Sequence, residues 1–234
     1  MRRAMAIERL RGKFIVIDGG EGCGKTTQTQ MLGVRLRNEG LNAVIVHDPG
    51  TTRIGQLIRQ LLLNPDNTDM SMRCEMLLYM AARAQMMRQI IAPALEQGSV
   101  VVSDRFVSST LAYQLGGDGL TAKEIRAVGD VAIDHRWPDL TVILDMPLER
   151  SSVRVDPQLM LSFKGSFKPR DDRDRIEQRS MEYHQQVRKN YLAQAKSEPA
   201  RYRVVNADRD VQAVHDDLWM HVMKLTGKGG AAHE

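Results

Sequence analysis

The chain is 234 residues long, with 42% hydrophobic and 26% charged residues, which is ordinary for a soluble globular protein with one large domain. A domain of this size buries a sizeable core without disulfides, and its two cysteines, Cys23 and Cys74, suit a reducing compartment. The net charge of +4 is compatible with polyphosphate ligands. Because the basic residues form no long run, we expect no nucleic-acid partner.

We expect both ends of the chain to lie outside the folded domain. No apolar run approaches the length that crosses a membrane, so we expect no membrane partner and a cytoplasmic location. Residues 1–12 contain four arginines but lack the apolar centre of a secretory signal, and we expect a flexible extension there. Residues 226–234, with their glycines and alanines, predict a flexible tail. A single domain is expected over residues 13–225.

Short apolar runs alternate with helical patterns along the chain. Phe14–Asp18 is an apolar run followed at once by glycines, which is typical of a buried parallel strand. Helical spacing then covers Lys25–Asn38, Ile54–Leu63 and Met70–Gln97, and we expect a kink in the last at Pro93. Further strands are predicted at residues 43–47, 100–104, 140–145 and 202–206. This alternation predicts an α/β fold with a five-stranded parallel sheet covered by helices on both faces.

One long irregular segment interrupts this order. Residues 155–173 are rich in Pro, Gly, Ser, Lys and Arg and lie between two helical patterns. Irregular segments of this length inside a compact domain tend to be lids or disordered segments. We therefore expect a lid at about residues 155–173.

The clearest motif is Gly19–Thr26, which reads Gly-Gly-Glu-Gly-Cys-Gly-Lys-Thr and matches the phosphate-binding pattern G-x-x-x-x-G-K-[ST]. Its glycines allow backbone N–H groups to face a phosphate, while Lys25 can reach the β- and γ-phosphates and the Thr26 hydroxyl can ligate Mg²⁺. The motif lies between a predicted strand and a predicted helix, as this pattern requires. We expect the three-layer sandwich of P-loop NTPases, with Mg²⁺-ATP as ligand. The expected ATP contacts are Gly19, Gly20, Glu21, Gly22, Cys23, Gly24, Lys25, Thr26 and Thr27.

Other features narrow the class of P-loop protein. A GTPase would need an Asn/Thr-Lys-x-Asp motif on a later strand, and the chain has none. Adenylate-kinase-like enzymes usually have Gly after the P-loop lysine, where this chain has Thr26. A kinase for a small acceptor fits best. A non-catalytic nucleotide-binding module and a nucleic-acid-binding ATPase remain as alternatives.

Four blocks of sequence resemble the thymidylate kinase family, from Phe14 to about Leu225. They are Phe14–Thr27, Asp48-Pro-Gly-Thr-Thr52 with the following helix, Leu77-Leu-Tyr-Met-Ala-Ala-Arg83, and Asp104-Arg-Phe106 with Ser109-Thr-Leu-Ala-Tyr-Gln114. Asp174-Arg-Ile-Glu177 then resembles the motif that closes the family's lid. The resemblance implies phosphorylation of dTMP to dTDP by ATP and Mg²⁺ in deoxynucleotide biosynthesis. A kinase for another deoxynucleotide or a deoxynucleoside is the alternative within the same class.

Phosphoryl transfer requires positioning and positive charge around the transferred group. Arg105 and Arg59 are candidates to hold the acceptor's phosphate, because guanidinium presents two donors to an anion. Asp104 ends a predicted strand and can hold Mg²⁺ or orient the acceptor, so we expect Thr26, Glu21 and Asp104 around the metal. The resemblance places Glu21 near the acceptor's 3′-hydroxyl as well, and Lys25, Asp104 and Arg105 among the catalytic residues.

The acceptor's base and sugar have their own candidate residues. Tyr79 and Arg83 are four residues apart on one helix, so a ring that stacks on a pyrimidine lies beside a donor for thymine O4. The resemblance adds Thr110 at the base edge and Tyr113 against the sugar's 2′ position. Asp48 contributes a further carboxylate to this crevice.

The resemblance also implies that the lid supplies positive charge, because the P-loop has Gly22 where one subtype of the family has an arginine. Arg170 and Arg173 are the candidates, since they lie nearest the Asp174–Glu177 block, and Lys164, Lys168 and Arg154 are further possibilities.

The block from His47 to Thr52 departs from the family pattern. The family's Arg-Glu-Pro-Gly-Gly-Thr block reads His47-Asp-Pro-Gly-Thr-Thr52 here, and Thr51 cannot adopt a positive φ as cheaply as glycine does.

The family forms homodimers through helices. We expect a homodimer to which a methionine face contributes; its residues are Met72, Met76, Met80 and Met87.

Overall fold

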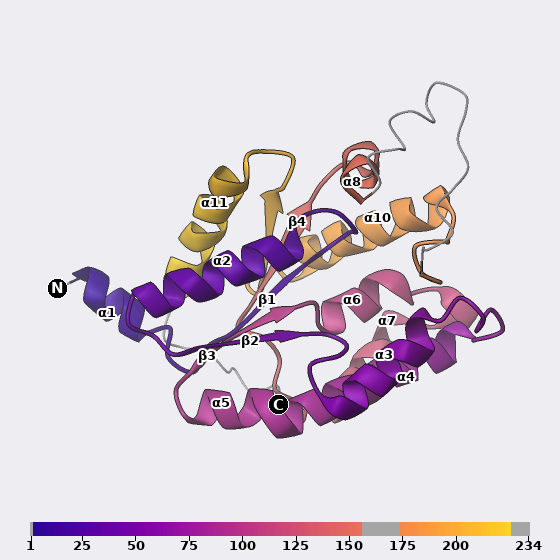
Figure 1. The fold of residues 1–234 in the computed structure, drawn as a ribbon, viewed down its shortest axis with the longest axis horizontal. Helices are drawn as coiled ribbons and strands as arrows, with labels where there is room; N and C mark the ends of the chain where they lie inside the picture. Colours follow the sequence, from indigo (N-terminus) through magenta and orange to yellow (C-terminus); the bar gives the residue numbers. More distant parts are fainter. Residues whose placement is uncertain (1, 156–173, 226–234) are drawn as a thin grey trace.

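The structure, a computed structural model, describes residues 2–155 and 174–225. A single sheet has five parallel strands in the order β2-β3-β1-β4-β5, so the first strand of the chain lies at its centre (Figure 1). Every strand lies where an apolar run predicted one. The strands are β1 (Phe14–Gly19), β2 (Ala43–His47), β3 (Val100–Asp104), β4 (Leu140–Asp145) and β5 (Tyr202–Asn206).

Helices cover both faces of this sheet (Figure 1). One face packs against α1 (Arg2–Glu8), α2 (Lys25–Asn38) and α11 (Val211–Met223). The other face packs against α4 (Met72–Met86), α5 (Ala92–Glu96), α6 (Val107–Tyr113), α7 (Ala122–Ala132) and α10 (Met181–Ser197). Helix α3 (Arg53–Leu63) lies against α4, and α8 (Leu148–Val155) follows β4.

The central strand shows why this sequence forms a sheet buried on both sides. Ile15 and Ile17 of β1 belong to the core beneath α2 and α11, whereas Phe14 and Val16 belong to the core beneath α4 to α7. All residues of β1 are buried. Because side chains alternate along a strand, an unbroken apolar run supplies both cores at once.

The long helix predicted to end near Gly98 is interrupted by a π-helical turn. Residues Met87–Ile91 form a π-helix directly before α5, whose first turn contains Pro93. Proline lacks the N–H that an α-helix needs and its ring crowds the carbonyl one turn earlier, so the backbone widens there. Met76, Met80 and Met87 are between 2% and 4% exposed, and Met72 is partly buried against the same core. The expectation that the methionine face contributes to dimerisation is therefore wrong.

The N-terminal segment also differs from the expectation. Residues 2–8 form α1, and the side chains of Ile7 and Leu10 are buried in the core beneath α2 and α11. The expected flexible extension over residues 1–12 is corrected, because these two apolar side chains dock the segment. The expected tail at residues 226–234 and lid residues 156–173 lie outside the described residues. No helix in the described part of the chain combines the length and the apolar character that crossing a membrane demands.

Candidate active site

The phosphate-binding motif forms a loop, the P-loop (residues 19–26), between β1 and α2. Gly19, Gly22 and Gly24 have φ values of 141°, 67° and 92°, which glycine adopts at little cost. A Cβ at Gly19 would lie 2.5 Å from the Leu144 carbonyl oxygen on β4, so no side chain fits there. Lys25 Nζ donates to the Gly20 carbonyl oxygen over 2.6 Å. Since α2 begins at Lys25, its positive end faces the loop, and the motif has the form of an anion cradle.

A hydroxyl and a carboxylate meet at the edge of this cradle. Thr26 Oγ1 donates to Asp104 Oδ2 over 2.7 Å, which joins the start of α2 to the end of β3. Oxygen atoms of this kind suit Mg²⁺, which usually takes one or two protein ligands together with phosphates and water. Among the described residues, no group of three or more His, Cys, Asp or Glu side chains is arranged to hold a metal ion. The residues present fit Mg²⁺.

Arg105 follows β3 in a backbone conformation that is rare for a residue with a side chain. Its φ is 70°, and conformations of this kind persist where the surrounding structure holds them. Its Nη1 donates to the Gly19 carbonyl oxygen and to the hydroxyls of Ser109 and Tyr191 over 3.2 to 3.3 Å. Both hydroxyls also donate to the buried carboxylate of Asp18. The guanidinium is thus held beside the P-loop by a network built on β1.

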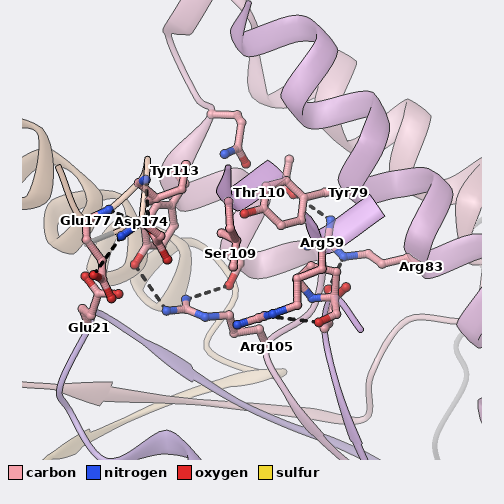
Figure 2. A pocket seen from close by; sticks show the side chains of 15 residues that line it. Glu21, Arg59, Tyr79, Arg83, Arg105, Ser109, Thr110, Tyr113, Asp174 and Glu177 are labelled. Atoms are coloured by element: carbon pink, nitrogen blue, oxygen red, sulfur yellow. Dashed lines mark hydrogen bonds and ion pairs between the residues drawn. The ribbon is translucent and has the colours of Figure 1, made fainter. Parts of the chain in front are cut away.

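A pocket opens next to the P-loop and encloses about 720 Å³, open solvent at its mouth included. All the residues predicted to bind the acceptor line it: Glu21, Asp48, Arg59, Tyr79, Arg83, Arg105, Thr110 and Tyr113. Figure 2 shows Glu21 at one end, Tyr79 and Arg83 at the other, and Arg105 between them. Along the pocket, the P-loop therefore comes first and Arg105 second. The end with Tyr79 and Arg83, called the aromatic end, comes last.

Arg83 is buried at the aromatic end and is held by two partners. Its Nε donates to Asp48 Oδ2 and its Nη1 donates to Thr110 Oγ1 over 2.6 Å, while its guanidinium lies 5.6 Å from the centre of the Tyr79 ring. Burial raises the pKa of Asp48, although the adjacent Arg83 acts in the opposite direction. The second carboxylate oxygen of Asp48 is buried and has no hydrogen-bond partner within the described residues. Arg83 is thus fixed in the pocket wall between β2 and α6.

Three carboxylates gather at the other end of the pocket. Glu21 of the P-loop lies at this end of the pocket with Glu177 and Asp174, and the backbone N–H of Asp174 donates to Glu177 Oε2 over 3.2 Å (Figure 2). Burial raises the pKa of Glu21, and burial together with the charges of Glu21 and Asp174 raises the pKa of Glu177 to about 7. Glu21 thus lies with Glu177 and Asp174 at the pocket, whereas Thr26 and Asp104 pair with each other at the edge of the cradle.

The altered block after β2 is accommodated without strain at Thr51. The positive φ of 126° falls on Gly50, and Thr51 keeps a negative φ. Thr51 Oγ1 accepts from the backbone N–H of His47 and donates to its carbonyl oxygen, each over 2.8 Å. Arg59, exposed on α3, donates to the Pro49 carbonyl oxygen over 3.3 Å. The threonine side chain thus closes the turn where the family pattern has a second glycine.

Sequence reasoning missed several residues of this site. Gln114, Ser109 and Ile176 line the pocket in addition to the predicted site residues, and Ser109 and Gln114 belong to the fourth family block. Asp174 and Glu177 belong to the noticed lid motif, which was a signal for their position. The lid candidates Lys164, Lys168, Arg170 and Arg173 lie outside the described residues, as does the side chain of Arg154.

The sequence of this chain is similar to known proteins over most of its length. The family model for thymidylate kinase matches residues 17–218. The chain belongs to the thymidylate kinase family. Thymidylate kinase of Halothermothrix orenii is 40% identical over 213 residues, which cover 91% of this chain and 97% of that protein. Thymidylate kinase of Pseudomonas syringae pv. tomato is 39% identical over 219 residues, covering 92% and 99%.

A solved structure of the family agrees in fold as well. The crystal structure of thymidylate kinase from Ehrlichia chaffeensis superposes with a TM-score of 0.69 at 28% identity, covering 90% of this chain and 97% of that one. The resemblance drawn from four sequence blocks is thereby confirmed. The expected five-stranded parallel P-loop fold is confirmed by the sheet and by this match.

Proposed function

We propose that this member of the thymidylate kinase family transfers the γ-phosphoryl group of ATP to dTMP, giving ADP and dTDP for pyrimidine deoxynucleotide biosynthesis. The observation that supports it best is the pocket, because one of its walls is the P-loop residue Glu21 and its opposite end is Tyr79 and Arg83. A nucleotide placed with its base at the aromatic end would direct its phosphate toward Arg105 and the ATP cradle. Phosphoryl transfer requires this in-line arrangement of donor and acceptor.

The P-loop would bind ATP, the phosphoryl donor. The backbone N–H groups of the P-loop and Lys25 Nζ would bind the ATP phosphates, with Lys25 leaving the Gly20 carbonyl for the β- and γ-oxygens. Thr26 and Asp104 would hold Mg²⁺, directly or through water, and the metal supplies charge neutralisation at the phosphates when bound. Glu21, predicted as a third metal residue, would act on the acceptor side, near the sugar's 3′-hydroxyl.

The acceptor side follows from the pocket. Arg105 and Arg59 would hold the phosphate of dTMP, and the network around Asp18 would keep Arg105 in place without cost at the moment of transfer. Tyr79 would stack on thymine, and Arg83 and Thr110 would donate to O4. Tyr113, whose hydroxyl accepts from Arg105 Nη2 over 3.5 Å, would close the space at the sugar's 2′ position.

The lid residues and the domain limits belong to the same proposal. We propose one P-loop kinase domain over residues 13–225, onto which α1 docks, with a lid at about residues 155–173. Arg170 or Arg173 would bring positive charge to the transferred group when the lid closes, and closure would exclude water. A cytoplasmic location suits the two free cysteines.

We also propose a homodimer, formed through α3 and α4 instead of the methionine face. Ile54, Leu57 and Leu61 recur on one side of α3 and are 37%, 48% and 51% exposed, and Leu77 of the adjacent α4 is 49% exposed. Exposed apolar side chains gathered on neighbouring helices are typical of a protein interface.

Measurement of ADP release from Mg²⁺-ATP with dTMP, dUMP, dCMP, dGMP, TMP and thymidine as acceptors tests the function. We expect turnover with dTMP to exceed turnover with the others. A preference for another acceptor would keep the phosphoryl-transfer site and overturn the assignment of the base site. Turnover that needs no acceptor but rises on addition of DNA would instead favour a nucleic-acid-dependent ATPase, and no turnover would favour a binding module.

A further inference from the structure

Glu75 of α4 is fully buried behind the pocket wall and binds three side chains at once. Its Oε2 accepts from Arg175 and from Arg179, the latter over 2.7 Å, and its Oε1 accepts from Gln114 Nε2 over 2.6 Å. Glu75 does not line the pocket, whereas Gln114 does. The proposed phosphoryl transfer gives this buried carboxylate no role. A buried charge with three donors is costly to assemble unless all partners are present.

The partners of Glu75 decide which way the Gln114 amide faces. Both guanidiniums donate to Glu75, and a guanidinium has no acceptor, so the Glu75 oxygens serve as acceptors in this cluster. The amide of Gln114 must therefore present its nitrogen to Glu75, which leaves the carbonyl oxygen Oε1 for the pocket. Gln114 is 1% exposed, and its Oε1 has no hydrogen-bond partner within the described residues. The wall thus contains an acceptor with a fixed direction and no protein donor.

The neighbouring donor has an equally fixed direction. Arg83 lines the same pocket, and guanidinium only donates. A pyrimidine that receives a hydrogen bond at position 4 from Arg83 and gives one at N3 to Gln114 must have a carbonyl and an imide N–H at these positions. Thymine and uracil have both, whereas cytosine has an amino group and an unprotonated N3.

We propose that Glu75 is a positioning residue that fixes the Gln114 carbonyl toward the acceptor's base and so makes the pocket select nucleotides with an imide N–H. This inference rests on the proposed function. It names the residues that would make the enzyme prefer a thymine-type base to a cytosine-type base. It also couples base selection to the segment after the lid through Arg175, which belongs to that segment and binds Glu75. Arg175 further donates from Nε to the Leu62 carbonyl oxygen over 3.0 Å, which ties this segment to α3.

The test compares kcat/KM for dTMP and for dCMP in four proteins: wild type, Glu75→Gln, Gln114→Leu and the double variant. We expect the dTMP preference to fall roughly tenfold to a hundredfold in Gln114→Leu, since the imide N–H loses its acceptor. We expect a fall in Glu75→Gln as well, because a glutamine can accept or donate and frees the Gln114 amide to turn. KM for ATP should stay unchanged in both single variants.

The double variant separates positioning from a general structural role. If Glu75 acts through Gln114, Glu75→Gln lowers the preference no further once Gln114 is leucine. Arg179→Met serves as the matched control, since it weakens the same cluster yet leaves Arg175 and the Glu75–Gln114 bond, and it should keep the preference. Where Glu75→Gln fails to fold, Glu75→Asp replaces it in the same comparison, because it keeps the charge but shortens the reach to Gln114.

The outcomes distinguish this inference from the proposed function. Wild-type enzyme that phosphorylates dTMP, with an unchanged preference over dCMP in Gln114→Leu, would overturn the inference alone. A further fall in the double variant would overturn the positioning role of Glu75. Wild-type enzyme without turnover on either nucleotide would overturn the proposed function, and the inference with it.

Discussion

Arg83 Nε donates to Asp48 Oδ2 over 2.5 Å, and the two side chains, 35 residues apart in the chain, are 1% and 0% exposed. The pair joins α4 to the end of β2 and forms part of the pocket wall. Attraction between the two charges offsets their removal from water only while both are present. The pair therefore contributes to stability and to the shape of the site together.

Substitution Arg83→Met should lower the free energy of unfolding by about 3 to 5 kcal/mol, because it leaves the Asp48 carboxylate buried without its partner. Urea unfolding followed by circular dichroism measures this loss. Arg59→Met is the matched control: Arg59 is an exposed arginine of the same pocket, so its loss should change stability little while raising KM for dTMP. An Arg83→Met protein as stable as wild type would contradict the role of the pair.

Substitution Lys25→Met should lower kcat roughly a hundredfold to a thousandfold, because the β- and γ-phosphates lose the ammonium that stabilises the transition state. A coupled assay for ADP measures kcat, and calorimetric titration with dTMP measures acceptor binding. We expect acceptor binding to be retained, since Lys25 does not line the acceptor pocket. Near-normal turnover in this variant would show that the P-loop does not bind the donor.

Substitution Arg105→Lys keeps a positive charge but loses the two-donor fork. Arg105 uses this fork to reach Gly19, Ser109, Tyr191 and Tyr113, and an ammonium cannot hold these directions together. We expect kcat/KM for dTMP to fall roughly tenfold to a hundredfold, with KM for ATP nearly unchanged. An increase in KM for ATP that matched the increase for dTMP would place Arg105 on the donor side instead.

The carboxylates around Glu177 should make stability depend on pH. The pKa of Glu177 rises from 4.5 to about 7 in the folded protein, so between these values the folded state holds a proton that the unfolded state has lost. This contribution to stability is present below pH 4.5 and is lost as pH rises through 7. Melting temperatures from pH 5 to pH 8 should therefore decline more in wild type than in Glu177→Gln. Parallel curves for the two proteins would contradict the raised pKa.

Substitution Leu57→Glu should weaken the proposed dimer by roughly thirtyfold or more, because a charge would be buried at the centre of an apolar interface. Sedimentation equilibrium measures the dissociation constant. Met220→Glu is the control, since Met220 is 51% exposed on α11 at the other face of the sheet and should leave association unchanged. A wild-type protein that is monomeric at assay concentrations would overturn the interface.

The sequence by itself determined the strands, the P-loop and the fold class. The reason is that these features are local: five apolar runs set the strands, and the spacing of Gly19, Gly24, Lys25 and Thr26 sets a loop that needs left-handed backbone. The family blocks then located the residues that line the pocket, because each block lies near the carboxyl end of a strand or on an adjoining helix. The parallel sheet brings those ends to one edge.

Only the tertiary structure decided which of these residues touch. The order β2-β3-β1 places the chain after β2 beside Arg83 and places Asp104 beside Thr26, pairs that no local pattern reveals. Glu75 meets Arg175 and Arg179 across 100 and 104 residues of chain, and Ile7 reaches a core built mainly from later segments. Propensity and periodicity describe neighbours in sequence, whereas burial, ion pairing and the direction of an amide depend on neighbours in space.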